Sequence, residues 1–166
     1  MQFRLAITTS LLALSAVSLV ACDDEDEDPN GPPDTQTFTA TLNGASEKPT
    51  PVTTNATASA TFTSTTTGTT TTIVYTVTVS GNLSGPVTLA HIHGPADANG
   101  VANPIVTLQV TSQNTTGVVV SGSFTTTGNA TINMQQLLAH MEAGNTYVNL
   151  HTATNPNGEI RGQISD

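Results

Sequence analysis

The chain has 166 residues, and its 12 acidic side chains outnumber its 3 lysines and arginines, which gives a net charge of −9. So few cations exclude a protein that binds the phosphate backbone of nucleic acid, because that affinity comes largely from clustered Lys and Arg. Threonine is abundant, and with Val and Ile it makes a β-branched composition that favours pleated sheet over helix. The sequence therefore predicts one all-β domain and excludes an all-helical protein.

Residues 1–21 are predicted to form a signal peptide. Arg4 precedes an apolar stretch, 5–21, which is interrupted by Thr and Ser and is too short for a permanent membrane span. The stretch ends at Cys22, the only cysteine, and Leu19-Val20-Ala21-Cys22 resembles a bacterial lipobox. We expect Cys22 to be lipidated; the alternative is an ordinary secretory peptide with an incidental cysteine.

Residues 22–36 are predicted to be a disordered tether. Six acidic residues, 23–28, are followed by a segment rich in Pro and Gly, and repulsion between like charges keeps such a chain extended and solvated. The lipid would make the membrane a partner and place the domain in the bacterial cell envelope, either periplasmic or at the cell surface. Because no second cysteine exists, a disulfide, a Cys nucleophile and a thiolate metal ligand are all excluded from the domain.

Residues 37–166 are predicted to be the folded β domain, in which apolar and polar residues alternate in short runs. Turn signals rich in Gly, Asn and Pro separate these runs. The Thr-rich segment 61–72 is interpreted as two strand ends joined by a hairpin loop at Gly68. Eight strands are expected, at 37–42, 58–63, 73–79, 87–93, 105–110, 118–124, 147–151 and 160–164. This pattern predicts an antiparallel sandwich or barrel whose threonine sides face water.

One segment has helical spacing instead. Met134, Leu137, Leu138 and Met141 fall at i, i+3, i+4 and i+7, and Asn133 is placed to cap the helix N-terminus. A single short amphipathic helix is therefore expected between two strands.

Histidines are the main candidates for chemistry. His91 and His93 lie two residues apart on a predicted strand, so both rings point to the same face, and His151 ends another predicted strand. If those strands are neighbours, the three imidazoles could hold a copper or zinc ion. The alternative is structural, with His91 and His93 bonded to the backbone of the Gly94-Pro95 loop. His140, on the predicted helix, is expected to be a surface or capping residue.

Signatures of other chemistries are missing from the sequence. It contains no G-x-S-x-G elbow and no Gly-rich phosphate loop, and the carboxylates of the predicted domain are scattered. Glu159 and Arg161 share a strand face at i, i+2 and are expected to pair at the surface, a contact worth at most about 1 kcal/mol. No catalytic residue is assigned.

Three motifs point to a family. The string 90–96, Ala-His-Ile-His-Gly-Pro-Ala, together with 147–152 and 158–164, resembles the CHRD domain, a module first described in chordin and present in many bacterial secreted proteins. The resemblance covers about 37–164. It implies a Greek-key β-sandwich or barrel of immunoglobulin-like or Cu/Zn superoxide dismutase-like topology. The resemblance also implies structural motif residues, which are Gly94, Pro95, Glu159 and Arg161.

Two classes of function remain open. The first is a lipid-anchored, non-catalytic binding or envelope module whose ligand would be a protein or a glycan. Low charge and the absence of a nucleophile or paired carboxylates favour it, and favour a protein that is not an enzyme. The alternative is a copper- or zinc-binding protein with a superoxide dismutase-like site, in which His91, His93 and His151 hold the metal and Arg161 attracts an anion.

Replacing Cys22 with Ser tests the anchor. The Cys22→Ser protein is expected to leave the membrane fraction while its domain stays folded, because the acidic tether contributes nothing to the core. Fractionation with immunoblotting and circular dichroism measures both. A variant that is processed yet still sediments with membranes would contradict the anchor.

Overall fold

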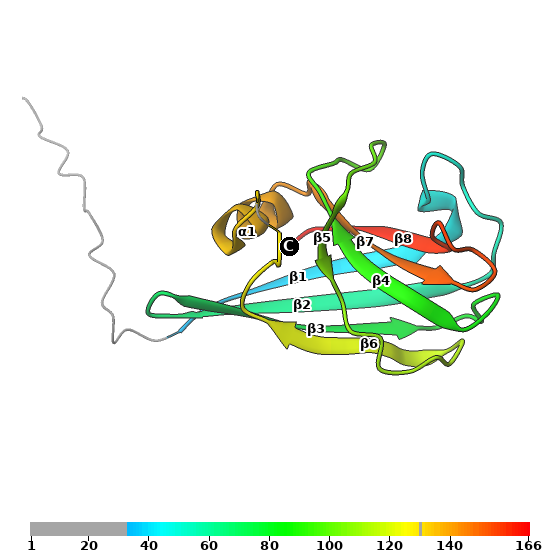
Figure 1. Cartoon of the computed structure of the whole chain (residues 1–166), viewed down its shortest axis with the longest axis horizontal. Coiled ribbons are helices and arrows are strands. Elements are labelled where there is room, and N and C mark those ends of the chain that lie inside the picture. The colour runs from blue at the N-terminus through cyan, green and yellow to red at the C-terminus, as the bar shows by residue number, and fades with distance from the viewer. Residues whose placement is uncertain (1–32, 130) are drawn as a thin grey trace, which may run out of the picture.

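The computed structural model describes residues 33–129 and 131–166 (Figure 1). The predicted signal peptide, Cys22 and the acidic run lie outside these residues. Among the residues described, no helix is long and apolar enough to cross a membrane. The elements are β1 (Asp34–Asn43), the 3-10 turn η1 (Gly44–Ser46), β2 (Thr57–Thr67), β3 (Thr70–Val79), β4 (Val87–His93), β5 (Pro104–Thr107), β6 (Gly117–Phe124), α1 (Met134–Glu142), β7 (Thr146–Thr152) and β8 (Ile160–Ile164).

The eight strands form one antiparallel sheet in the order β5-β4-β7-β8-β1-β2-β3-β6. The sheet curls into a half-barrel, and residues 108–112 run between its two edges. Leu108 N–H donates to Ala90 of β4, while Thr111 N–H donates to Val119 of β6. The predicted all-β antiparallel class with one short helix is confirmed.

The first three strands are longer than the sequence pattern predicts. Strand β1 begins at Asp34, inside the segment expected to belong to the tether, because β2 extends to Thr67 and offers Thr66 as the partner of Asp34. The predicted hairpin between β2 and β3 is present, and Gly68 at its turn has φ of 56°, a left-handed conformation that glycine adopts without a Cβ penalty.

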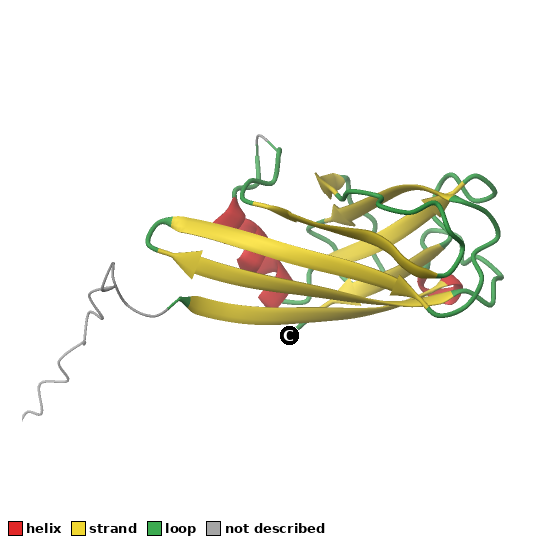
Figure 2. Cartoon of the chain, turned by 90° about the horizontal axis from the view of Figure 1, so that it is seen from below, coloured by secondary structure: helices red, strands yellow, loops and turns green. Residues whose placement is uncertain are grey.

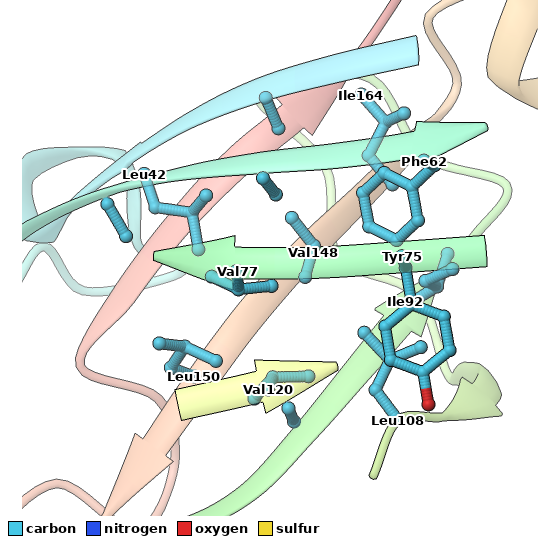
Figure 3. Close-up of a cluster of buried hydrophobic side chains, with 14 of the residues drawn as sticks. Leu42, Phe62, Tyr75, Val77, Ile92, Leu108, Val120, Val148, Leu150 and Ile164 are labelled. Atoms are coloured by element: carbon cyan, nitrogen blue, oxygen red, sulfur yellow. The ribbon is translucent and has the colours of Figure 1, made fainter. Parts of the chain in front are cut away.

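The core lies inside the curled sheet. Side chains that alternate along each strand point inward, so β2 and β3 contribute residues that face those of β4 and β7 across the barrel (Figure 3). Val148 and Leu150 of β7 are fully buried, as are Ile160 and Ile164 of β8. These two strands therefore direct alternate residues into the core.

Helix α1 begins with the expected cap. Asn133 accepts from the Gln136 backbone and Gln136 returns a side-chain bond to the Asn133 N–H, which completes a capping box. Leu137 and Met141 are buried. Figures 1 and 2 both place α1 on the side of the sheet where the β2–β3 hairpin turns.

Shortening a buried side chain of β7 tests which of its side chains point into the core. Leu150→Ala is expected to lower the free energy of unfolding by about 2 to 5 kcal/mol, because Leu150 is fully buried and leaves a cavity. Thr61→Ala, at an exposed position of β2, is the control and should stay within about 0.5 kcal/mol. Urea denaturation measures both, and equal shifts would show that the facing is wrong.

Candidate functional site

The candidate site lies on the outer face of the strands β4 and β7. These strands are neighbours, and their register pairs His93 with Tyr147 and His91 with Asn149. Because side chains alternate along a strand, His151 lies on the same face as Tyr147 and Asn149. The structure thus brings together the three histidines that the sequence offered as metal ligands, from two strands about 60 residues apart in the chain.

The outer face of β7 is buried, although the alternation of residues in the sequence is typical of a sheet with one wet face. All seven residues of β7 are buried, and Asn149 and His151 are only 4 % and 8 % exposed. The loop 94–103, between β4 and β5, folds back over Tyr147, while Pro156 and Gly158 lie against His151 and Asn149. The prediction of a wet outer face is therefore wrong for β7, because alternation cannot reveal a loop that returns to cover the polar side.

Arg161 holds the covering loop in place. Its guanidinium donates from Nη1 to the Gly100 carbonyl at 2.8 Å and from Nη2 to the Asp97 carbonyl at 3.0 Å. The guanidinium also lies 3.4 Å over the ring of Tyr147, whose hydroxyl accepts from the Ala102 N–H and donates to the Ala102 carbonyl. These bonds hold Asp97, Gly100 and Ala102 of the loop on the sheet, and Gln163 of β8 adds a bond to the Ala96 carbonyl.

The three histidine rings form a compact cluster. One ring nitrogen from each of His91, His93 and His151 lies within 4.8 Å of those of the others. His91 Nδ1 and His151 Nε2 are 3.1 Å apart, close enough to share one hydrogen. Nitrogen ligands about 2.0 to 2.1 Å from a tetrahedral zinc ion stand about 3.4 Å from one another. A small movement of the three rings toward one another would therefore allow all of them to bind one ion.

Backbone carbonyls fix which nitrogen of two of the rings is free. His93 Nδ1 lies 2.9 Å from the Ala102 carbonyl, and His151 Nδ1 lies 3.0 Å from the Pro156 carbonyl. A carbonyl only accepts, so both Nδ1 atoms carry the hydrogen and both Nε2 atoms keep a lone pair. Metal-bound histidines are held in the same way, by a second bond from the other ring nitrogen.

Burial keeps two of the three rings neutral. Desolvation, followed by the proximity of His151 and His93, lowers the pKa of His91 to about 4. Burial also lowers the pKa of His93, against the raising effects of its bonds to Ala102 and Asn149. Two of the three rings are therefore uncharged near pH 7, which is the form of imidazole that binds a metal.

The proposed structural role of the histidines is present in part. His93 does bond to the loop that begins at Gly94-Pro95, through Ala102, but His91 faces His151 instead. Gly94 itself is required by close packing, since a Cβ there would stand 2.9 Å from the Ile105 side chain. His140 lies in the last turn of α1, away from the cluster, where a basic side chain complements the helix dipole.

Two polar residues of the site were missed by the sequence analysis. Asn149 stands between the paired histidines, and its Oδ1 is 3.1 Å from His93 Nε2. Glu47 follows η1 and is 3 % exposed; burial raises its pKa to about 7, while Arg161, the Lys48 backbone and the Asn149 amide act to lower it. Asn149 lies two residues before His151 on the same strand, so alternation could have placed it on the same face. Nothing in the sequence indicated Glu47.

The predicted surface pair of Glu159 and Arg161 is wrong. Both residues are at most 1 % exposed, and they bond to different parts of the chain. Arg161 binds the loop 94–103, whereas the Glu159 carboxylate accepts from Ser84, Thr54 and Thr152. These bonds lower the pKa of Glu159 against the raising effect of its burial. Two-residue spacing placed the side chains on one strand face, but different loops cover each of them.

Comparison with known proteins assigns the family. The model of the CHRD domain matches residues 38–164, which covers most of the chain. The chain therefore belongs to the CHRD domain family. No curated protein and no solved structure matches it.

Replacing the buried carboxylate tests the Glu159 network. Glu159→Gln is expected to lower the free energy of unfolding at pH 7 by about 1 to 3 kcal/mol, because an amide cannot accept from all of the donors around it. Since folding lowers the pKa of Glu159, its contribution is present above pH 4.5 and is lost as the pH falls through the folded value. Urea denaturation at several pH values measures this.

The matched control is Glu142→Gln, at an exposed position of α1. It should leave the stability at pH 7 and its pH dependence nearly unchanged. The Glu159 assignment would be contradicted if Glu159→Gln lost stability below pH 4.5 as steeply as the unmodified protein does.

Proposed function

We propose that this chain is a lipid-anchored, extracytoplasmic CHRD-domain protein that binds a ligand rather than catalysing a reaction. Membership of the CHRD family supports a binding module. The apolar leader, the lipobox-like Leu19-Val20-Ala21-Cys22 and the acidic segment after it support the anchor and a location in the cell envelope.

The ligand that the geometry supports best is a divalent transition-metal ion, zinc or copper, held by His91, His93 and His151. The observation that carries this proposal is the clustering of three imidazole nitrogens within 4.8 Å, two of them with their hydrogens committed to carbonyls. Imidazole is a preferred ligand for both metals.

Binding is favoured over superoxide chemistry because of where Arg161 lies. In a superoxide dismutase-like design Arg161 would attract an anion to the metal, but its guanidinium is bonded to Gly100 and Asp97, and the residue is 1 % exposed. An anion could reach it only after the loop 94–103 had been displaced. Arg161 thus acts on the loop and not on an entering substrate.

Metal titration of untagged protein tests this function. Protein stripped with a chelator is expected to bind one Zn²⁺ per chain, and His151→Gln should weaken that binding at least about 100-fold, beyond what loss of an outer-shell partner costs. His140→Gln, on α1, is the matched control and should bind as the unmodified protein does. Competition with a chromophoric chelator measures the affinities.

Two results would contradict the metal assignment. One is an unmodified protein that binds no Zn²⁺ and no Cu²⁺ at micromolar concentrations. The other is His151→Gln protein with unchanged affinity, which would place the bound ion elsewhere on the chain.

A further inference from the structure

The residue Asn149 lies beside His91 and His93 on the outer face of the sheet. Its strand register pairs it with His91, and its Oδ1 lies 3.1 Å from His93 Nε2. It is 4 % exposed and therefore has no bulk water to satisfy it. Any polar atom at this position has to find its partner within the cluster.

The contact between His93 Nε2 and Asn149 Oδ1 has no hydrogen to share. His93 Nδ1 carries its hydrogen toward the Ala102 carbonyl, so the Nε2 of a neutral ring has only a lone pair. The Oδ1 of Asn149 is also an acceptor only. Two acceptors 3.1 Å apart repel each other unless a cation lies close to both.

The opposite end of the amide fixes its orientation. Glu47 Oε1 and Asn149 Nδ2 lie 2.7 Å and 2.9 Å from the point where a Cβ on Gly158 would stand. The Asn149 side chain also acts to lower the pKa of Glu47, which agrees with an amide nitrogen that faces the carboxyl group, although Glu47 Oε1 completes no hydrogen bond. Gly158, with φ of 122°, provides the space for both. Reversing the amide would turn Oδ1 toward the Glu47 carboxyl group, and the two would both be acceptors whenever that carboxyl is ionised.

We propose that Asn149 Oδ1 is the fourth ligand of the metal ion held by His91, His93 and His151, with Glu47 as a positioning residue that orients the amide. This inference rests on the proposed function. The resulting set of three nitrogens and one carbonyl oxygen contains no soft ligand, so it selects Zn²⁺ over Cu⁺, which prefers thiolates and thioethers.

A filled fourth position makes the site closed. Structural zinc sites have four protein ligands, whereas catalytic sites keep one position for water or substrate. With Asn149 bound, the ion would have no exchangeable position. This agrees with a module that binds metal without turning over a substrate.

Spectroscopy with Co²⁺ in place of Zn²⁺ tests the assignment, because the visible spectrum of Co²⁺ reports its coordination. The spectrum of the unmodified protein with Co²⁺ is expected to be unchanged by azide, since no position is open. Asn149→Leu has nearly the same size and no ligand atom. It should bind Co²⁺ at least about tenfold more weakly and respond to azide.

Two controls accompany this variant. Asn149→Asp keeps an oxygen at the same place and should retain Co²⁺ binding without an azide response. Asn114→Ala, at an exposed loop position, should behave as the unmodified protein. The melting temperature of each variant shows whether it has folded, and the azide test of the unmodified protein needs no variant at all.

The outcomes separate the two proposals. If the unmodified protein binds no Co²⁺, the metal function and the Asn149 assignment both fall. If it binds Co²⁺ and azide changes its spectrum, the site is open and only the Asn149 assignment falls. The same conclusion follows if folded Asn149→Leu matches the unmodified protein in affinity and in its lack of response to azide.

Discussion

Strand β7 is buried on both of its faces, and the candidate site depends on that burial. Its inner face carries Val148 and Leu150 into the core. Its outer face lies under the loop 94–103 at Tyr147 and under the segment 156–158 at Asn149 and His151. Buried polar groups must be hydrogen-bonded, so covering the outer face forces each histidine, amide and guanidinium there to find a protein partner. Arg161 supplies the closure, because its two bonds to loop carbonyls keep the loop on the sheet.

The same burial sets the chemistry of the histidines. Removing water lowers the pKa of His91 and of His93 and keeps their rings neutral. Bonds from Nδ1 of His93 and of His151 to the Ala102 and Pro156 carbonyls leave Nε2 of each ring with its lone pair. A face open to solvent would offer neither effect, since exposed imidazoles rotate and are protonated near pH 6.5. The fold therefore arranges the imidazole nitrogens before a metal ion binds.

The sequence predicted the strands better than it predicted their surroundings. Alternation located all eight strands, and spacing of i, i+3, i+4 and i+7 located the capped helix. The shared face of His91 and His93 followed from their two-residue spacing. Alternation could not show that β4 and β7 are neighbours, because sheet order depends on contacts between distant segments. For the same reason Glu47 was missed, since it reaches the site from η1, and Glu159 and Arg161 were placed at the surface although loops cover both.

Anomalous diffraction at the zinc edge, from crystals grown with one equivalent of Zn²⁺, tests whether the three histidines hold the ion. We expect a single strong peak on the outer face of β4 and β7, about 2.0 to 2.1 Å from one nitrogen of each of His91, His93 and His151. Crystals in which zinc occupies other positions while this cluster shows no anomalous density would contradict it.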